Sequence, residues 1–216
     1  MSLVHSLRRP AGSADRAVVL VHGMGGSGEY LAPLLDHLDP QRRALGVLLQ
    51  APHRAPDAGW SWYDGGHNLP DPQSFADALD ALVSEVGPVL AEAGLSWRRT
   101  VVIGYSQGAI LSYALALGRG RPEVAALAAL SGFIPDVAGQ TLDLDRAAGL
   151  SVAQVHGTND DVIPLSWAHK DRELLASSGA MLWVRELPIA HTVDLSVGVP
   201  LRGWLAGAAT QNVRPT

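Results

Sequence analysis

The chain has 216 residues, of which 47% are hydrophobic and 17% are charged, and its formal net charge is −5. This length and composition predict one globular domain with a full core, and they exclude a disordered or fibrous protein. The sequence contains no cysteine, which excludes disulfides, thiolate metal sites and a cysteine nucleophile. The acidic balance argues against a nucleic-acid partner, which needs a concentrated basic face. No apolar run matches a membrane span or a signal peptide, so we expect a cytoplasmic protein with no stable membrane anchor.

Short aliphatic runs that end in Gly, Ser, His or a proline-containing loop recur along the chain and are typical of buried parallel strands. In chain order, the predicted strands cover residues 17–21, 45–50, 100–104, 125–131, 152–156 and 181–186. Stretches with helical periodicity lie between and after them, at residues 74–93, 107–117, 166–178 and 200–209. This alternation predicts an α/β fold, a mostly parallel central sheet with helices on both faces. We expect one domain over residues 1–216, with its core at about 17–209 and a loose tail at 210–216.

The residues from Gly104 to Gly108 form a G-x-S-x-G motif between a predicted strand and a predicted helix. In this context the motif predicts a tight turn that lifts the Ser106 hydroxyl clear of the sheet. Side chains two positions before and after the serine would clash in such a turn, so both glycines are steric necessities. The turn also places Ser106 at a helix N-terminus, whose free N–H groups favour developing negative charge. A glycine-flanked turn without chemistry is the alternative interpretation.

A serine nucleophile needs a histidine base, and the histidine needs a carboxylate that holds its tautomer. Asp160 and Asp161 follow one predicted strand, and His191 follows the next. The order serine, aspartate, histidine is the order found in α/β hydrolases. Position singles out His191 among the eight histidines of the chain. Spacing does not separate the two adjacent aspartates, and Asp194 is a weaker third candidate.

Backbone N–H donors must stabilise the oxyanion of a tetrahedral intermediate. One expected donor is the N–H of Gln107, directly after Ser106, and the loop after the first predicted strand supplies the other. In that loop Gly23 lets the backbone turn inward, and Met24 offers its N–H group. The Met24 side chain can also fill space over the pocket, and both interpretations are compatible.

The same loop matches the G-x-G-x-x-G fingerprint of dinucleotide-binding proteins at Gly23, Gly25 and Gly28. That fingerprint needs an acidic residue about twenty positions later, at the end of the second strand. The second predicted strand ends in Gln50 instead. A dinucleotide-binding oxidoreductase is therefore a weak alternative, because it also leaves Ser106 unexplained.

Aromatic residues concentrate in the loop at 59–66. Trp62 and Tyr63 are candidates for the wall of an acyl or alcohol site, since exposed aromatics are costly unless they pack or line a pocket. The equally weighted alternative is a loop pinned onto the core by these side chains. Gly23 and Ile163 complete the residues expected at a substrate-binding surface.

These motifs together resemble the phospholipase/carboxylesterase family of α/β hydrolases, which includes bacterial carboxylesterases and acyl-protein thioesterases. The resemblance rests on H-G-M-G-G-S-G at 22–28, Q-A-P at 50–52, W-Y-D at 62–64, G-Y-S-Q-G-A at 104–109, L-S-G at 130–132 and H-G-T-N-D-D-V-I-P at 156–164. These blocks and their context stretch from about residue 17 to about 205. Two departures stand out: Tyr105 occupies a position where the family commonly has Phe, and P-I-A at 188–190 replaces a glycine-rich approach to the histidine.

The resemblance implies that Ser106 is the nucleophile, His191 the base and Asp160, the fifth residue of the H-G-x-x-D stretch, the acid. It implies an oxyanion hole made by the N–H groups of Met24 and Gln107, and no metal or organic cofactor. The expected activity is that of a serine carboxylesterase that forms a covalent acyl-enzyme, with lysophospholipase or thioesterase activity as an extension.

The length of the chain leaves no room for a large cap, which predicts an open pocket for small or medium acyl esters or thioesters. A non-catalytic binding module of the same fold is the rival hypothesis from another class. It is disfavoured because every triad residue is present. The sequence predicts nothing about oligomeric state.

Overall fold

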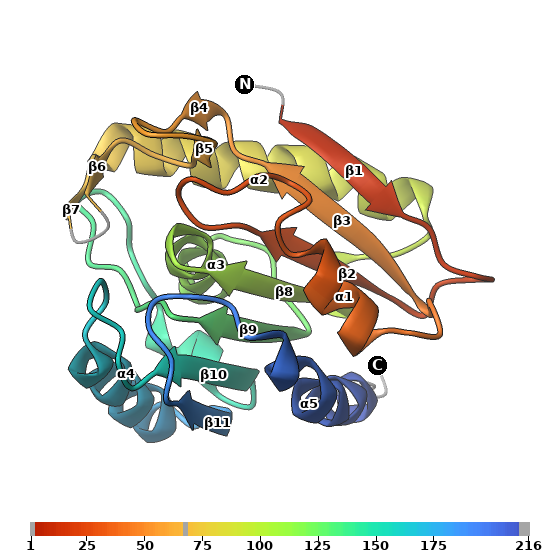
Figure 1. Ribbon diagram of the computed structural model, residues 1–216. Helices are drawn as coiled ribbons and strands as arrows, with labels where there is room; N and C mark the ends of the chain where they lie inside the picture. Colours follow the sequence, from red (N-terminus) through yellow and green to blue (C-terminus); the bar gives the residue numbers. More distant parts are fainter. Residues whose placement is uncertain (1–2, 67–68, 212–216) are drawn as a thin grey trace.

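The computed structural model describes residues 3–66 and 69–211 and contains a seven-stranded sheet (Figure 1). The strand order is β1-β3-β2-β8-β9-β10-β11. The strands are β1 (Val4–Arg8), β2 (Arg16–Val21), β3 (Ala44–Gln50), β8 (Thr100–Tyr105), β9 (Ala126–Leu130), β10 (Ser151–Gly157) and β11 (Met181–Leu187). All neighbouring strands pair in parallel except β1, which is antiparallel to β3. Two short ribbons lie outside this sheet, β4 (His53–Arg54) with β5 (Trp60–Ser61) and β6 (Gly65–Gly66) with β7 (Leu69–Pro70).

Helices cover both faces of the sheet (Figure 1). One face carries α2 (Pro72–Glu92), α3 (Gln107–Leu117) and α4 (Leu165–Ser177), and the other carries α1 (Ala32–Leu38) and α5 (Gly198–Gln211). Three short 3-10 turns complete the described elements, η1 (Trp97–Arg99), η2 (Leu144–Ala147) and η3 (Leu195–Val197). The predicted fold class, a mostly parallel sheet between helical layers, is confirmed.

The central strands are buried on both faces, as their continuous aliphatic runs predict. In β2, Val19 and Val21 pack into the core cluster under α2 and α3, whereas Val18 and Leu20 pack into the cluster under α1 and α5. Burying one such side chain contributes roughly 1.5–3 kcal/mol of hydrophobic free energy. The hydrophobic effect therefore holds a helical layer against each face of these strands.

Two helices on the same face of the sheet, α2 and α3, are buried to different extents. Every residue of α3 is buried, because this helix packs against the middle of the sheet. In α2 the buried residues form one stripe, as the helical periodicity predicts: Phe75, Ala78, Leu79, Ala81, Leu82, Val86 and Leu90. Asp71 caps the start of α2, where its carboxylate accepts a 2.8 Å hydrogen bond from the Ser74 N–H.

The sequence pattern does not predict β1 or α1. β1 is an edge strand whose residues 5–8 are only half-buried, so it lacks a continuous apolar run. α1 has seven residues, which is too short for helical periodicity to stand out. The core also begins before residue 17, because Leu3 is buried in the cluster under α2.

The predicted tail at 210–216 begins too early. Thr210 and Gln211 belong to the last turn of α5, and residues 212–216 lie outside the described part of the chain. Across residues 3–66 and 69–211, the structure contains no helix with the length and apolar character that crossing a membrane requires.

Candidate active site

Ser106 lies in a strained turn between β8 and α3. Its backbone has φ 53° and ψ −120°, a conformation that residues with side chains rarely adopt. A Cβ atom on Gly104 would lie 2.3 Å from the Gly108 carbonyl oxygen, and one on Gly108 would lie 2.0 Å from the Val21 carbonyl oxygen. Backbone atoms leave no room for either side chain. The predicted steric role of both glycines is therefore confirmed.

The structure brings Ser106, His191 and Asp160 together at the carboxyl ends of β8, β10 and β11. His191 Nε2 lies 2.9 Å from Ser106 Oγ, and His191 Nδ1 lies 2.8 Å from Asp160 Oδ2. The Asp160 side chain is 0% exposed and that of His191 is 13% exposed. An ionised carboxylate only accepts hydrogen bonds, so Nδ1 carries the ring hydrogen and Nε2 accepts from the serine hydroxyl. This arrangement can remove a proton from Ser106.

Asp160 is held in its ionised form by the loop that follows it. Its Oδ1 atom accepts hydrogen bonds from the Val162 N–H at 3.0 Å and from the Ile163 N–H at 2.8 Å. Burial alone would raise the pKa of Asp160, but these N–H groups and the bond with His191 outweigh burial and lower the pKa below its ordinary value. The neighbouring Asp161 is exposed. Geometry therefore distinguishes the two adjacent acids, which spacing did not.

The third candidate acid, Asp194, caps a short 3-10 turn. Its carboxylate accepts a 2.7 Å hydrogen bond from the Ser196 N–H and so caps η3.

His156 contacts the same carboxylate from the end of β10. Its Nε2 atom lies 2.9 Å from the Ile163 carbonyl oxygen and 3.5 Å from Asp160 Oδ2. A carbonyl oxygen only accepts, so this nitrogen carries the hydrogen. Burial lowers the pKa of His156, against the opposing effect of the bond to Ile163. The ring therefore acts as a neutral support for the loop that carries Asp160.

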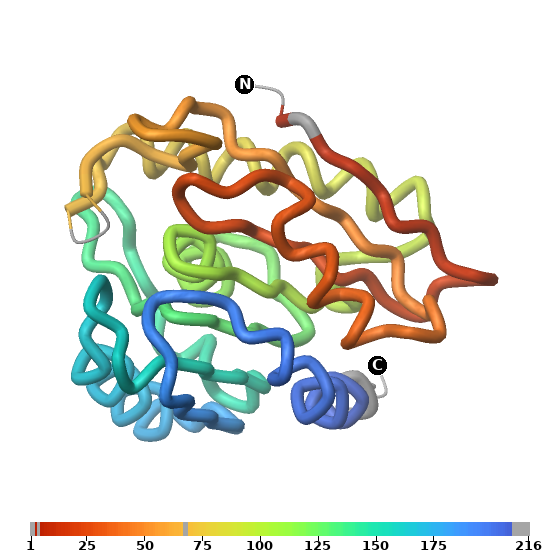
Figure 2. Tube along the Cα trace, viewed as in Figure 1, coloured from red at the N-terminus to blue at the C-terminus, as the bar shows by residue number. Residues whose placement is uncertain are grey.

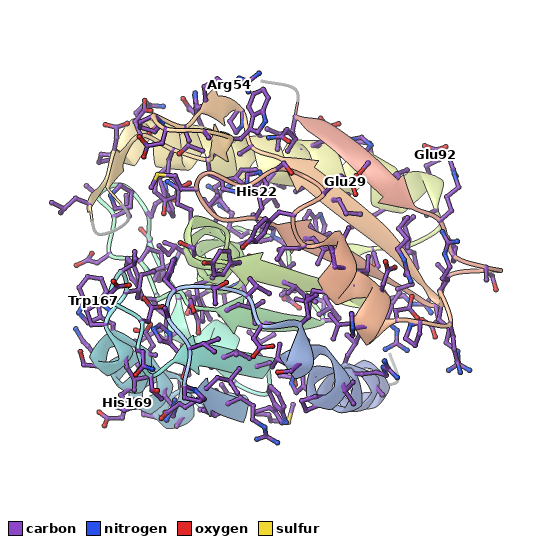
Figure 3. All side chains as sticks on the ribbon, viewed as in Figure 1. His22, Glu29, Arg54, Glu92, Trp167 and His169 are labelled. Carbon is purple, nitrogen blue, oxygen red and sulfur yellow. The ribbon has the colours of Figure 1, made fainter. Side chains whose placement is uncertain are left out.

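His22 has both ring nitrogens committed to the protein. Nε2 accepts from the Ala51 N–H at 3.1 Å, so Nδ1 carries the hydrogen and donates to the Gly23 carbonyl oxygen at 2.6 Å. Burial lowers the pKa of His22, which keeps the ring neutral. Figure 3 labels His22 near the middle of the molecule, whereas Arg54, Glu92 and His169 lie at its edges. His22 therefore supports the loop that begins at Gly23.

Two backbone N–H groups beside Ser106 have no hydrogen-bond partner among the described residues. One belongs to Met24, which lies in a turn closed by the bond from the Gly26 N–H to the Gly23 carbonyl oxygen at 3.1 Å. The other belongs to Gln107, the first residue of α3. A Cβ atom on Gly23 would lie 3.0 Å from Ser106 Cβ, so the turn passes in contact with the serine. Free donors at this place are what an oxyanion requires.

The aromatic loop, residues 59–66, is hydrogen-bonded to the start of α3 and to the residue after β2. Gln107 Oε1 accepts from the Trp62 N–H at 3.1 Å and from the Ser61 hydroxyl at 3.2 Å. The Trp62 indole N–H donates to the His22 carbonyl oxygen at 2.7 Å. The side chains of Trp62 and Tyr63 lie in the core cluster under α2. The structure thus matches the alternative interpretation, in which these aromatics pin the loop.

None of the expected substrate-contacting side chains has an open surface. Trp62, Tyr63 and Ile163 are all buried, and Ile163 takes part through its backbone, which bonds Asp160. Gly23 is buried under Tyr105 and Ser106. The exposed apolar surface near the serine belongs to the side chains of Met24, 46% exposed, and Tyr30, 44% exposed.

Sequence reasoning missed Tyr30. This side chain stacks on Tyr105 with ring centroids 5.8 Å apart and an interplanar angle of 20°. The available signal was an aromatic residue two positions after Gly28, the last glycine of the glycine-rich loop. Its contact with the residue before Ser106 appears only when the strands are assembled.

The G-x-G-x-x-G loop is already hydrogen-bonded within the protein. The Gly25 N–H donates to the Trp60 carbonyl oxygen at 2.9 Å, and the Gly28 N–H donates to Gln50 Oε1 at 3.0 Å. A bound pyrophosphate would need such N–H groups to be free. Gln50 also occupies the place where a dinucleotide site needs an acid. The dinucleotide hypothesis gains no support from this loop.

A cavity of about 210 Å³ lies at the N-terminal ends of β2 and β3, whereas Ser106 lies at the C-terminal ends of the strands. Arg16, Asp39, Arg43, Arg202 and Leu205 are among its lining residues. It therefore takes no part in the arrangement around Ser106.

Comparisons with known proteins agree with this architecture. Residues 4–196 match the family model described as Phospholipase/Carboxylesterase. A Bacillus cereus carboxylesterase is similar with a TM-score of 0.81 and 19% identity, covering 95% of this chain and 94% of that chain. A Mesorhizobium loti carboxylesterase has a TM-score of 0.80 and 22% identity, covering 95% of both chains. Esterase PE8 has a TM-score of 0.80 and 23% identity, covering 96% of this chain and 100% of that chain. At these identities the similarity of the structures is one of fold.

Proposed function

Because the chain belongs to the phospholipase/carboxylesterase family and is a serine ester hydrolase, we propose that Ser106, His191 and Asp160 are its catalytic triad. We propose further that it hydrolyses small to medium acyl esters through a covalent acyl-enzyme. One observation carries this proposal. A continuous chain of hydrogen bonds runs from Asp160 Oδ2 through both ring nitrogens of His191 to Ser106 Oγ.

In the proposed first half-reaction, Ser106 Oγ attacks the acyl carbon while His191 Nε2 takes the hydroxyl proton. The imidazolium that forms is stabilised by the ionised Asp160. The tetrahedral intermediate then collapses, the bond to the alcohol oxygen breaks, and Nε2 returns the proton to the leaving alcohol. In the second half-reaction a water molecule loses a proton to Nε2 and attacks the acyl-serine. The bond from the acyl carbon to Ser106 Oγ then breaks and Nε2 gives its proton to Oγ, which releases the carboxylic acid and restores the Ser106 hydroxyl.

We assign the oxyanion hole to the N–H groups of Met24 and Gln107. The support is that both donors are free among the described residues and that the turn at Gly23 contacts Ser106. Removing one such donor from a site of this kind typically costs 10²–10³ in rate, on the order of 3 kcal/mol. The position of Gln107 at the start of α3 adds the favourable end of the helix dipole.

The exposed side chains of Met24 and Tyr30 are the surface we propose for contact with the substrate. Met24 follows Gly23, whose turn contacts Ser106, and Tyr30 stacks on Tyr105, the residue before Ser106. Such a surface suits a short or medium acyl chain, for which an enclosing tunnel is not required. Lysophospholipids and acyl thioesters present the same carbonyl group, and we propose them as additional substrates.

The test is hydrolysis of p-nitrophenyl esters from acetate to palmitate by the wild type, Ser106→Ala and the control Ser84→Ala. Ser84 is an exposed serine of α2, so its variant should match the wild type. Ser106→Ala should lower kcat by about 10⁴-fold or more. Turnover retained by Ser106→Ala would contradict the triad. Lysophosphatidylcholine and an acyl-CoA thioester, assayed with the same variants, decide the finer activities.

A second readout separates an enzyme of narrow specificity from a binding module. A fluorophosphonate probe labels a serine only when its base activates it. Labelling of the wild type without turnover of the esters would indicate a hydrolase with an untested substrate. Absence of both labelling and turnover would favour the non-catalytic module.

A further inference from the structure

The residue before the nucleophile contacts the backbone of the base. The Tyr105 hydroxyl donates to the His191 carbonyl oxygen at 3.0 Å, and the two rings lie with centroids 5.2 Å apart. Tyr105 is the last residue of β8, and its buried side chain belongs to the core cluster under α1 and α5. A side chain from the centre of the sheet thus reaches the loop that carries His191.

His191 lies in an irregular segment, residues 188–194, between β11 and η3. Figure 2 shows this segment in blue, passing beside the green turn from β8 to α3. Its upstream end is fastened to the loop after β10. The Thr158 N–H donates to the Leu187 carbonyl oxygen at 2.7 Å, and the Asn159 N–H donates to the Ile189 carbonyl oxygen at 3.1 Å.

These bonds stop short of the base. Beyond them, the Thr192 N–H donates to the Ala190 carbonyl oxygen at 2.8 Å, a bond internal to the segment. Within residues 3–66 and 69–211, the bond from Tyr105 is the one hydrogen bond that ties the backbone of residues 190–193 to the sheet. The position of the His191 main chain therefore depends on this hydroxyl.

The Tyr105 hydroxyl is a permanent donor. Burial, followed by the nearby Tyr30 and Asp160, raises its pKa well above the ordinary value of a tyrosine. The phenol is therefore neutral and carries its hydrogen at every pH at which the protein would be assayed. Stacking against Tyr30 also restrains the ring that bears it.

We propose that Tyr105 is a positioning residue whose hydroxyl holds the backbone of His191 where the ring reaches both Ser106 and Asp160. The inference rests on the proposed function, in which His191 is the base. The hydrogen bond joins the backbone of His191 to Tyr105, the residue directly before Ser106. It therefore restrains the distance between the base and the nucleophile. A displacement of about 1 Å at a catalytic group can lower the rate by about 10²-fold.

Tyr105→Phe tests the inference, with Tyr113→Phe as the matched control. Phenylalanine keeps the ring of Tyr105 and its packing, and water can bond the freed carbonyl of the half-buried His191. Tyr113 is a buried tyrosine of α3, and in the described part of the chain no hydrogen bond joins its hydroxyl to residues 188–194. The readouts are kcat and KM for a p-nitrophenyl ester per titrated Ser106, and the rate of labelling by a fluorophosphonate.

Tyr105→Phe should lower kcat per titrated serine about tenfold, because one of several restraints on the base is lost, and leave KM within about twofold. Labelling should slow by the same factor, since it uses the same base. Tyr113→Phe should leave both rates within about twofold of wild type. A merely structural role of Tyr105 would change the fraction of titratable enzyme and leave the rate per titrated serine unaltered.

The outcomes separate this inference from the proposed function. If Ser106→Ala and His191→Gln abolish turnover but Tyr105→Phe keeps both wild-type rates, the positioning role is overturned and the triad stands. If a loss in Tyr105→Phe falls wholly on KM, the positioning role is overturned as well. If His191→Gln keeps wild-type turnover, the proposed function itself is wrong.

Discussion

The turn that carries Ser106 and the segment that carries His191 present their side chains to each other, yet they are built in opposite ways. Every residue of β8 and α3 is buried, and backbone atoms lie against both glycines of the turn. Residues 188–194 are half-buried or exposed, and they form no helix or strand. Packing of the sheet therefore determines the position of the nucleophile, whereas a few hydrogen bonds determine that of the base.

This difference predicts different consequences for the same kind of substitution. An atom added in the turn cannot be accommodated without moving the buried backbone, so it should reduce the free energy of unfolding. A change that touches the segment can be absorbed by a small movement toward solvent, and should reduce activity more than stability.

The largest effect is expected for Asp160→Asn. An amide no longer holds the histidine tautomer in which Nε2 accepts from Ser106, and kcat should fall by about 10⁴-fold. Asp161→Asn is the matched control, because its exposed side chain should leave kcat within about twofold. Steady-state kinetics on both variants check the assignment, and a large loss in Asp161→Asn would reverse it.

Gly108→Ala should give the largest loss of stability. The added methyl group would lie 2.0 Å from the Val21 carbonyl oxygen, so strand or helix must shift. We expect a loss of about 3 kcal/mol or more in the free energy of unfolding, or roughly 6–12 °C in Tm. Gly87→Ala in α2 is the control, because its methyl would meet nothing within 4 Å. That variant should gain about 0.5–1 kcal/mol through its better helix propensity. Equal Tm values for the two variants would contradict the buried packing of the turn.

Gly157→Ala places a methyl group at the end of β10, against the segment 188–194 that carries His191. The new atom would lie 2.4 Å from the Ile189 carbonyl oxygen and push the approach to His191 outward. We expect kcat to fall by about 10²-fold, since the base is displaced, while Tm falls by roughly 2–4 °C. Kinetics and thermal unfolding of one preparation decide this. A Tm loss as large as that of Gly108→Ala would show that both regions are equally constrained.

A buried acid of α4 supplies a pH-dependent comparison. Asp171 of α4 accepts a 2.8 Å hydrogen bond from the Ile134 N–H, in the loop after β9. Burial raises the pKa of Asp171 from 3.8 to about 6, against the opposing effects of that hydrogen bond and of Lys170. Below about pH 3 the carboxyl is protonated in both the folded and the unfolded chain. As pH rises from about 3 to about 6, the unfolded chain ionises before the folded chain does, so the wild type loses stability.

Asp171→Asn removes this ionisation. At pH 7 the variant should be more stable than the wild type by about 3 kcal/mol, and the difference should fall below about 1 kcal/mol at pH 4. Asp136→Asn, which changes an exposed acid, should show no such trend. Urea unfolding of the three proteins between pH 4 and 8 measures the effect. A stability difference that does not depend on pH would contradict the raised pKa of Asp171.

The sequence predicted an element correctly where several neighbouring residues all favoured the same structure. The central strands were predictable because they are apolar on both faces, and the motif around Ser106 was predictable because its five residues are contiguous in the chain. β1 and α1 were missed for the opposite reason. β1 is a half-buried edge strand, and α1 is a single short stretch whose buried leucines find their partners only in the packed layer against α5.

The aromatic loop shows where residue type is insufficient. Trp62 and Tyr63 have side chains suited equally to a pocket wall and to a core, so composition could not choose. The two bonds that Trp62 donates, from its backbone N–H to Gln107 Oε1 and from its indole N–H to the His22 carbonyl oxygen, decide the matter, and they join parts of the chain 45 and 40 residues apart.

By itself, the sequence determined the alternation of strands and helices, the turn at Ser106 and the chain order of serine, acid and histidine. These features could be predicted because hydrophobic periodicity and the five-residue motif each occupy a short continuous stretch of the chain. Only the tertiary structure decided which way the aromatic loop packs, and that the Tyr105 hydroxyl reaches the backbone of His191. Those outcomes depend on atoms brought within about 3 Å from elements as many as 86 residues apart, where a side chain's partners are set by how the sheet and its layers assemble.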